Sequence, residues 1–232
     1  MTWATSPRLL TALIMLTVLA GCAGSKPPPD WQMNAHGALQ RSVQAYLVGN
    51  DRVAGAELDR ARAEISTTGR IDLMARAELL RCAAQAAALA FDDCPGFERL
   101  RADAAPADQA YADLLRGRLQ AGQAALLPAP QQALAQVRPG SDGEAAALQA
   151  VADPLSRLLG AALLLRAGGA TAASAALAVD TASAQGWRRP LLAWLRLQQL
   201  RAERAGDATE ALRLGRRIEL VLSAGSPTAE PR

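Results

Sequence analysis

Three cysteines and one histidine are the side chains of this sequence with the most distinctive chemistry. Cys22 stands at the end of the uncharged apolar segment that begins at residue 9, whereas Cys82 and Cys94 lie in the middle of the chain. A cysteine thiol can be acylated, oxidised to a disulfide or bound to a metal. The surroundings of each cysteine therefore decide which reaction the sequence predicts.

No metal centre or catalytic centre is predicted from these residues. Two distant cysteines and one histidine make no recognisable set of metal ligands. The sequence contains no HExxH, no phosphate-binding GxxxxGK[ST] and no dinucleotide fingerprint. His36 has no GxSxG nucleophile turn to serve, and we expect it to be a solvated side chain near the start of a helix. We therefore predict no catalytic residue, no metal and no cofactor.

Leu19, Ala20, Gly21 and Cys22 resemble the lipobox of bacterial lipoproteins. The apolar run before them is far shorter than the roughly 20 residues that cross a bilayer, which is typical of an export signal. The resemblance implies that the Cys22 thiol receives a diacylglyceryl group, that residues 1–21 are removed, and that the new amine is acylated. The other interpretations are a signal with a chance cysteine and a buried apolar helix.

The resemblance also implies where the protein is held. Each buried CH₂ contributes about 0.8 kcal/mol, so three acyl chains on Cys22 would fix the protein to a lipid bilayer. Ala23 occupies the position at which an aspartate retains lipoproteins in the inner membrane of enteric bacteria, which favours the periplasmic face of the outer membrane. The prolines within residues 22–33 predict an extended tether. Residues 224–232 are expected to form a disordered tail.

Cys82 and Cys94 would both face an oxidising compartment, where paired thiols usually form a disulfide. A disulfide between them requires the helix expected at 71–90 to end by about residue 89, with the following FDDC segment folded back along it. Two separate thiols, reduced or buried, and a redox-active pair are the alternatives.

The composition predicts an all-α protein. Apolar residues make up 50% of the chain and aromatic residues only 3%, and strong helix formers far outnumber strand formers. A helical domain is expected over residues 34–223, built from stacked antiparallel helix hairpins. The expected helices are 34–48, 52–66, 71–90, 95–103, 106–122, 129–137, 144–167, 170–185, 189–205 and 208–223, with a kink or break at Pro154 in the seventh.

The last helix pair resembles the tetratricopeptide repeat. Trp194 and Leu197 match the aromatic and leucine of its first helix, Gly206 matches the turn, and Ala211 matches the small residue of its second helix. The resemblance implies the helix-pair architecture alone, without a peptide-binding groove. The turns do not recur at a constant period of 34 residues, so an irregular helical bundle is the alternative fold.

Charge argues against nucleic acid as a partner. The 25 basic residues are almost balanced by 22 acidic ones, and arginines alternate with acids as in ELDRARAEI at 57–65. This pattern is typical of a solvated helix face.

The function predicted from these observations is that of a lipid-anchored, non-catalytic scaffold or assembly factor in the cell envelope. Its partners would be the bilayer, bound through Cys22, and an envelope protein of unknown identity. The alternative is a peptidoglycan-acting enzyme of the lytic transglycosylase type. Such enzymes need a buried acidic glutamate, typically followed by serine, but this sequence has no Glu-Ser pair and its aromatic residues are scattered.

Overall fold

Helices account for most of residues 27–224, which are the residues that the computed structural model describes. This part of the chain contains no strand, which confirms the predicted all-α class. The α-helices are α2 (Asp30–Leu47), α3 (Asp51–Ser66), α4 (Ile71–Ala87), α5 (Pro95–Glu98), α6 (Pro106–Leu115), α7 (Ala129–Ala135), α8 (Glu144–Gln149), α9 (Pro154–Arg166), α10 (Ala172–Ala184), α11 (Arg188–Arg204) and α12 (Ala208–Ser223); the 3₁₀ helices are η2 (Arg101–Asp103) and η3 (Gln123–Leu126).

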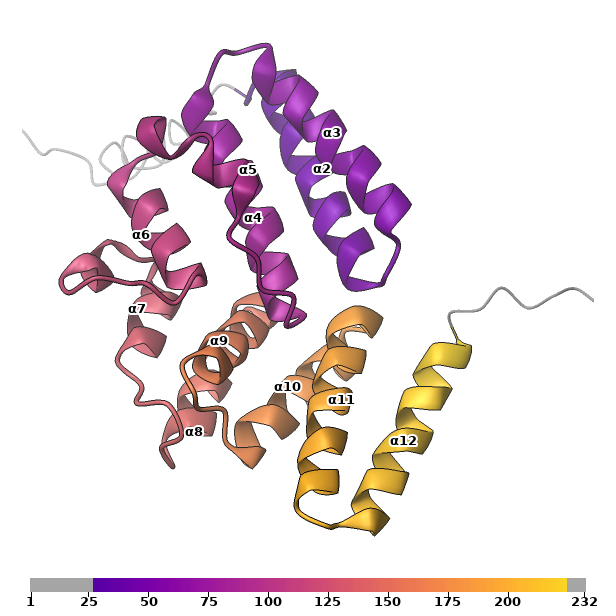
Figure 1. The fold of residues 1–232 in the computed structure, drawn as a ribbon. Helices are drawn as coiled ribbons and strands as arrows, with labels where there is room; N and C mark the ends of the chain where they lie inside the picture. Colours follow the sequence, from indigo (N-terminus) through magenta and orange to yellow (C-terminus); the bar gives the residue numbers. More distant parts are fainter. Residues whose placement is uncertain (1–26, 225–232) are drawn as a thin grey trace, which may run out of the picture. The chain divides into compact units, whose positions relative to one another are not determined.

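Consecutive helices form packed pairs, as the sequence predicted. In Figure 1, α2 and α3 run antiparallel at one end of the helical array, and α11 and α12 do so at the other. The central helix α4 packs against α3, α6 and α9, while α10 packs against both α9 and α11. Residues from Trp31 onward belong to one compact unit.

Polar caps and glycines set many of the helix boundaries. The side chains of Asn50, Asp153, Thr171 and Asp207 each accept a hydrogen bond from a backbone N–H in the first turn of the helix that follows. At the end of α11, Gly206 adopts a φ of +75°, a left-handed conformation that glycine enters without the strain a side chain would cause.

Several boundaries differ from those predicted. Helix α2 begins at Asp30, so the predicted tether of residues 22–33 is too long by four residues; an acidic residue in the first turn favours this start. Helix α6 ends at Leu115 and not near residue 122, because Gly117 turns the chain with a φ of +68°. The break predicted at Pro154 in the helix 144–167 is confirmed, since α8 ends at Gln149 and Pro154 opens α9.

Some predicted segments lie outside the described residues. These are the signal at 1–21, including Leu19, Ala20 and Gly21, the lipidation site Cys22, and the tail from residue 225 onward. Within residues 27–224, none of the helices combines the length and apolar content needed to cross a membrane.

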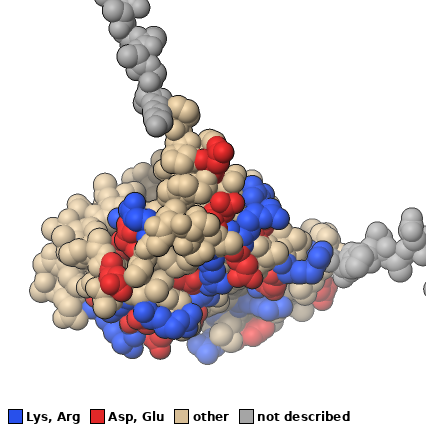
Figure 2. Space-filling model, turned by 90° about the horizontal axis from the view of Figure 1, so that it is seen from above, with Lys and Arg blue, Asp and Glu red and all other residues tan. Residues whose placement is uncertain are grey.

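The core is built largely from alanine and leucine around a few aromatic anchors. Trp194 and Phe97 are fully buried, and the indole N–H of Trp194 donates a 3.3 Å hydrogen bond to the carbonyl oxygen of Ala87 at the end of α4. Charged side chains of both signs are interspersed on the face seen in Figure 2, which agrees with the alternating pattern of the sequence.

Candidate functional site

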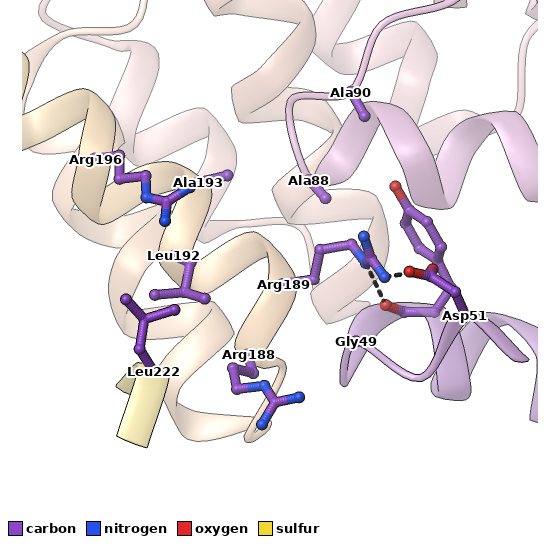
Figure 3. A pocket seen from close by; sticks show the side chains of 11 residues that line it. Gly49, Asp51, Ala88, Ala90, Arg188, Arg189, Leu192, Ala193, Arg196 and Leu222 are labelled. Atoms are coloured by element: carbon purple, nitrogen blue, oxygen red, sulfur yellow. Dashed lines mark hydrogen bonds and ion pairs between the residues drawn. The ribbon is translucent and has the colours of Figure 1, made fainter. Parts of the chain in front are cut away.

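A hollow lined by three arginines opens between the α2–α3 turn and the start of α11. A cavity of about 520 Å³ lies between the start of α11, the α2–α3 turn, the end of α4 and the last turn of α12 (Figure 3). We call it the arginine pocket. Its lining consists of Tyr46, Gly49, Asp51, Ala88, Ala90, Arg188, Arg189, Leu192, Ala193, Arg196 and Leu222.

One of the three arginines is fixed by the α2–α3 turn. Arg189 donates from Nε to the carbonyl oxygen of Tyr46 at 2.7 Å and forms an ion pair with Asp51 (Figure 3). Its guanidinium also stacks 4.3 Å from the centroid of the Tyr46 ring. Burial raises the pKa of the Tyr46 phenol, so this side chain stays neutral at physiological pH. Arg189 therefore holds one wall of the pocket in place.

The other two arginines are free to bind a ligand. Neither Arg188 nor Arg196 forms an ion pair or a side-chain hydrogen bond within residues 27–224, although most arginines of this region do one or the other. Arg188 is half-buried and Arg196 is exposed. They lie eight residues apart on α11 with Leu192 between them, so all three side chains share one face of the helix. Planar guanidinium groups recognise carboxylate and phosphate groups through paired hydrogen bonds.

The lining is suited to binding, and Tyr46 and Asp51 are its only groups capable of acid–base chemistry among the described residues. The described residues around the pocket include no serine, cysteine, histidine or glutamate, and the only carboxylate, Asp51, is already paired with Arg189. Two free guanidiniums over an apolar floor of Leu192 and Leu222 can hold an anionic group next to apolar atoms.

A second hollow continues along the same side of the last helix pair. It has a volume of about 620 Å³ and lies between α11 and α12. Its lining is Gln199, Glu203, Gly206, Ala208, Ala211, Leu212, Gly215, Arg216 and Glu219. Helical periodicity places these residues on the same faces of α11 and α12 as the lining of the arginine pocket. We call the two hollows together the α11–α12 groove.

Exposed leucines lie on this helix pair. The exposed fractions are 42% for Leu200, 66% for Leu212, 71% for Leu220 and 45% for Leu222. A helix at the open end of a helical stack usually carries a polar outer face, because nothing covers it. Leu222 lines the arginine pocket and Leu212 lines the second hollow, and exposed apolar side chains at a groove mark surfaces that contact a partner.

The two central cysteines are brought together. Cys82 on α4 and Cys94 are bonded as a disulfide, with Cα atoms 5.8 Å apart, within the range that a disulfide spans. Helix α4 ends at Ala87, earlier than the predicted residue 90, because Leu89 adopts a left-handed φ of +60° and turns the chain back. The following loop runs alongside the helix, as a bridge between these residues requires.

Asp92 joins the cysteines in the only described group with metal-like spacing. The ligand atoms of Cys82, Asp92 and Cys94 lie within 4.8 Å of one another. Sulfur atoms joined in a disulfide are not available as thiolates, so this group could hold a metal only after reduction. The oxidised arrangement has a structural role: Asp92 accepts a 2.9 Å hydrogen bond from the Cys94 amide and shapes the loop.

The residues of the repeat-like motif contribute to packing. Trp194 is fully buried against α4, and Leu197 is partly buried against the same core. Gly206 forms the turn between α11 and α12, and Ala211 faces inward on α12. The structure thus places these residues in an antiparallel helix pair, while their assignment to the repeat family stays a prediction. His36 is exposed on α2.

The two buried glutamates of the described region are both occupied. The carboxylate of Glu78 is paired with Arg62 and Arg81. Glu144 is fully buried, and its two oxygens accept hydrogen bonds from the amides of Gly140 at 2.7 Å and Thr171 at 3.0 Å. Both carboxylates are thus engaged by groups within the fold.

The arginines were not identified from the sequence, although a signal exists. Residues 181–202 contain four arginines and no acidic residue, in contrast to the alternating charges elsewhere. Arginines without acidic neighbours on their own helix are available to a partner from outside it.

Comparison of the chain with protein-family models, with curated proteins and with solved structures finds no match.

Proposed function

We propose that this protein is a lipid-anchored, non-catalytic adaptor of the bacterial cell envelope, which binds a partner protein through the α11–α12 groove. The observation that carries the proposal is the pair of free guanidiniums of Arg188 and Arg196 in one pocket with the exposed Leu222. A partner segment with acidic and apolar side chains would satisfy both features.

The anchor rests on the lipobox-like residues that end at Cys22. Cells that express the native chain should incorporate labelled palmitate into it, and the protein should stay with the membranes after a carbonate wash. Cys22→Ser should abolish the label and release the protein or leave it unprocessed. A Cys22→Ser protein that matures normally and stays in the carbonate-washed membranes would refute the anchor.

Partner binding is tested independently of the anchor. A photo-crosslinking amino acid at Leu192 should capture a discrete protein in cells, and the charge reversals Arg188→Glu and Arg196→Glu together should abolish this product. Arg99→Glu is the control, because Arg99 directly follows α5, is exposed, does not line the pocket and has no ion pair among the described residues. Equal crosslinking by both variants would contradict the assignment of the pocket.

The enzyme alternative predicts a different outcome. Incubation of the purified protein with peptidoglycan would release muropeptides if the protein cleaved glycan strands. The carboxylate of Glu78 is held by two arginines and that of Glu144 by two backbone amides, which supports the adaptor over this alternative. We expect no release of muropeptides above that of a heat-denatured sample.

A further inference from the structure

A second cavity, far from the arginine pocket in sequence, has the character of a small-molecule site. It has a volume of about 200 Å³ and lies between α6, α7 and α9. Its lining is Leu114, Leu119, Gln131, Leu134, Ala135, Val137, Pro139, Gly160, Leu163, Leu164 and Ala167. All but one of these residues have apolar side chains or none.

The exception, Gln131, is the informative residue. It is only 5% exposed, and it lines the cavity. Its side-chain amide forms no hydrogen bond with any residue in the described part of the chain, whereas its neighbour Gln132 donates to two carbonyl oxygens, those of Ala125 and Leu127. The amide is therefore available to form a hydrogen bond with a molecule that enters the cavity.

Gly160 keeps the cavity walls close together. A Cβ atom at this position would lie 2.4 Å from Leu134 and 2.9 Å from Leu148, so a side chain here would push α7 and α9 apart. The glycine allows leucines from both helices to meet at the floor of the cavity. Close packing of α9 against Leu134 and Leu148 forms one side of the cavity. The connections before and after α7, which contribute Leu119, Val137 and Pro139, form the other side.

We propose that this cavity binds a small, mostly apolar molecule that carries one hydrogen-bonding group, and that Gln131 recognises that group. An apolar cavity of about 150 Å³ accommodates benzene, so a volume of about 200 Å³ suits a substituted single ring or a chain of similar size. The amide of Gln131 offers both a donor and an acceptor, so the ligand can carry a hydroxyl or a carbonyl group. Water alone is the competing occupant.

The test uses a matched pair of probes, p-cresol and toluene, which differ by one hydroxyl group. The full chain is placed in lipid nanodiscs with ¹³C-labelled leucine methyl groups, so that shifts of Leu134 and Leu163 report binding at the cavity and not partition into lipid. We expect p-cresol to shift these signals with saturation and to bind more tightly than toluene. Loss of one hydrogen bond corresponds to a difference of about fivefold to tenfold.

Four variants separate recognition of the ligand by Gln131 from general effects on the cavity. Gln131→Leu should lower the affinity for p-cresol about fivefold to tenfold and leave toluene unchanged, whereas Gln136→Leu, on the exposed end of the same helix, should change neither. Leu163→Trp and, independently, Val137→Trp should fill the cavity and prevent the binding of both probes. Intact leucine spectra before titration show that each variant is folded.

Any one of four results would overturn the proposal. Absence of saturable shifts in the native chain would mean that the cavity holds only water. Equal affinity for the two probes in the native chain, or an equal effect of Gln131→Leu and Gln136→Leu, would remove Gln131 as the recognising group. Binding that persists in both folded tryptophan variants would place the probes elsewhere. None of these results bears on the anchor or on the arginine pocket.

Discussion

The indole nitrogen of Trp187 donates a 3.0 Å hydrogen bond to Oε1 of Gln44, a residue that lies 143 positions earlier in the chain. Two residues further along α11, Arg189 bonds to the Tyr46 carbonyl at the same sequence separation. These contacts seat the end of α2 against the start of α11. They are the reason that the arginine pocket has walls from both ends of the helical domain.

Removal of the Trp187–Gln44 hydrogen bond should weaken the domain modestly. Trp187 is 8% exposed, so an indole N–H without a partner is largely hidden from water. We expect Gln44→Met to lower the free energy of unfolding by about 0.5–1.5 kcal/mol in urea titrations. Gln40→Met, on the exposed surface of the same helix, is the control. Trp187→Phe combined with Gln44→Met should reveal a coupling energy near 1 kcal/mol, and strictly additive effects would argue against the hydrogen bond.

Backbone strain at Ala170 should be removable. Ala170 has a left-handed φ of +64°, which is unfavourable for a residue with a side chain. We expect Ala170→Gly to raise the free energy of unfolding by up to about 1 kcal/mol, because relief of strain outweighs the greater flexibility of glycine in the unfolded chain. The mirror experiment is Gly206→Ala, where φ is +75° and an added Cβ meets nothing within 4 Å. This change should destabilise by about 1 kcal/mol, and effects of the same sign at both positions would contradict the argument.

Acid should weaken the ion pairs around Glu98. Hydrogen bonds from Arg101, at 3.0 and 2.9 Å, hold the pKa of the Glu98 carboxyl below its usual value, with a further contribution from Arg116. A pKa lowered by folding stabilises the protein above the unfolded value of about 4.3, and this stabilisation is lost as pH falls through the lower folded pKa.

Glu98→Gln should therefore destabilise the protein at pH 6, and its difference from the native chain should shrink by pH 3. Urea titrations at both pH values measure the difference. Glu203→Gln removes a surface carboxylate that has no ion pair among the described residues and serves as the control. A difference that stays constant or grows on acidification would show that the Glu98 cluster does not act through this carboxylate.

Glutamine should not be able to replace the carboxylate of Glu144 without loss of stability. Its carboxylate accepts hydrogen bonds from two amides on different loops, Gly140 and Thr171, and glutamine would turn an NH₂ group toward one of those donors. We expect Glu144→Gln to lower the free energy of unfolding by about 1–3 kcal/mol, because one buried amide loses its acceptor. Glu219→Gln on the exposed face of α12 should change stability by less than about 0.5 kcal/mol. A neutral effect of Glu144→Gln would mean that water replaces the lost acceptor.

Local sequence signals were sufficient for the helices that end at glycine or begin at a capping side chain. Gly49, Gly168 and Gly206 all adopt a positive φ where a turn was expected. The end of α4 could not be found in this way, since the left-handed residue there is Leu89, whose side chain packs partly against the core. Tertiary contacts impose that turn, and no local propensity indicates it.

The candidate site could not be predicted from the sequence, for a related reason. The motif residues near Trp194 indicated where helices pack, and the cysteine spacing indicated which loop folds back. A pocket between the α2–α3 turn and the start of α11 depends on the path of the chain through all the intervening helices. The sequence around Arg188 and Arg196 lacks acidic residues, which marks these arginines as unusual. No local sequence pattern indicates that they share a pocket with Tyr46 and Asp51.

The contacts across 143 residues also set an order of assembly. A chain that emerges from its N-terminal end presents α2 and α3 long before α11 has been made, and distant contacts form only after the entropy of closing that long loop has been overcome. Nearby pairs such as α11 and α12 can join early, whereas the seating of Trp187 on Gln44 comes late. The arginine pocket is therefore completed last, and any chain cut short before residue 187 would reach the end of its folding without one.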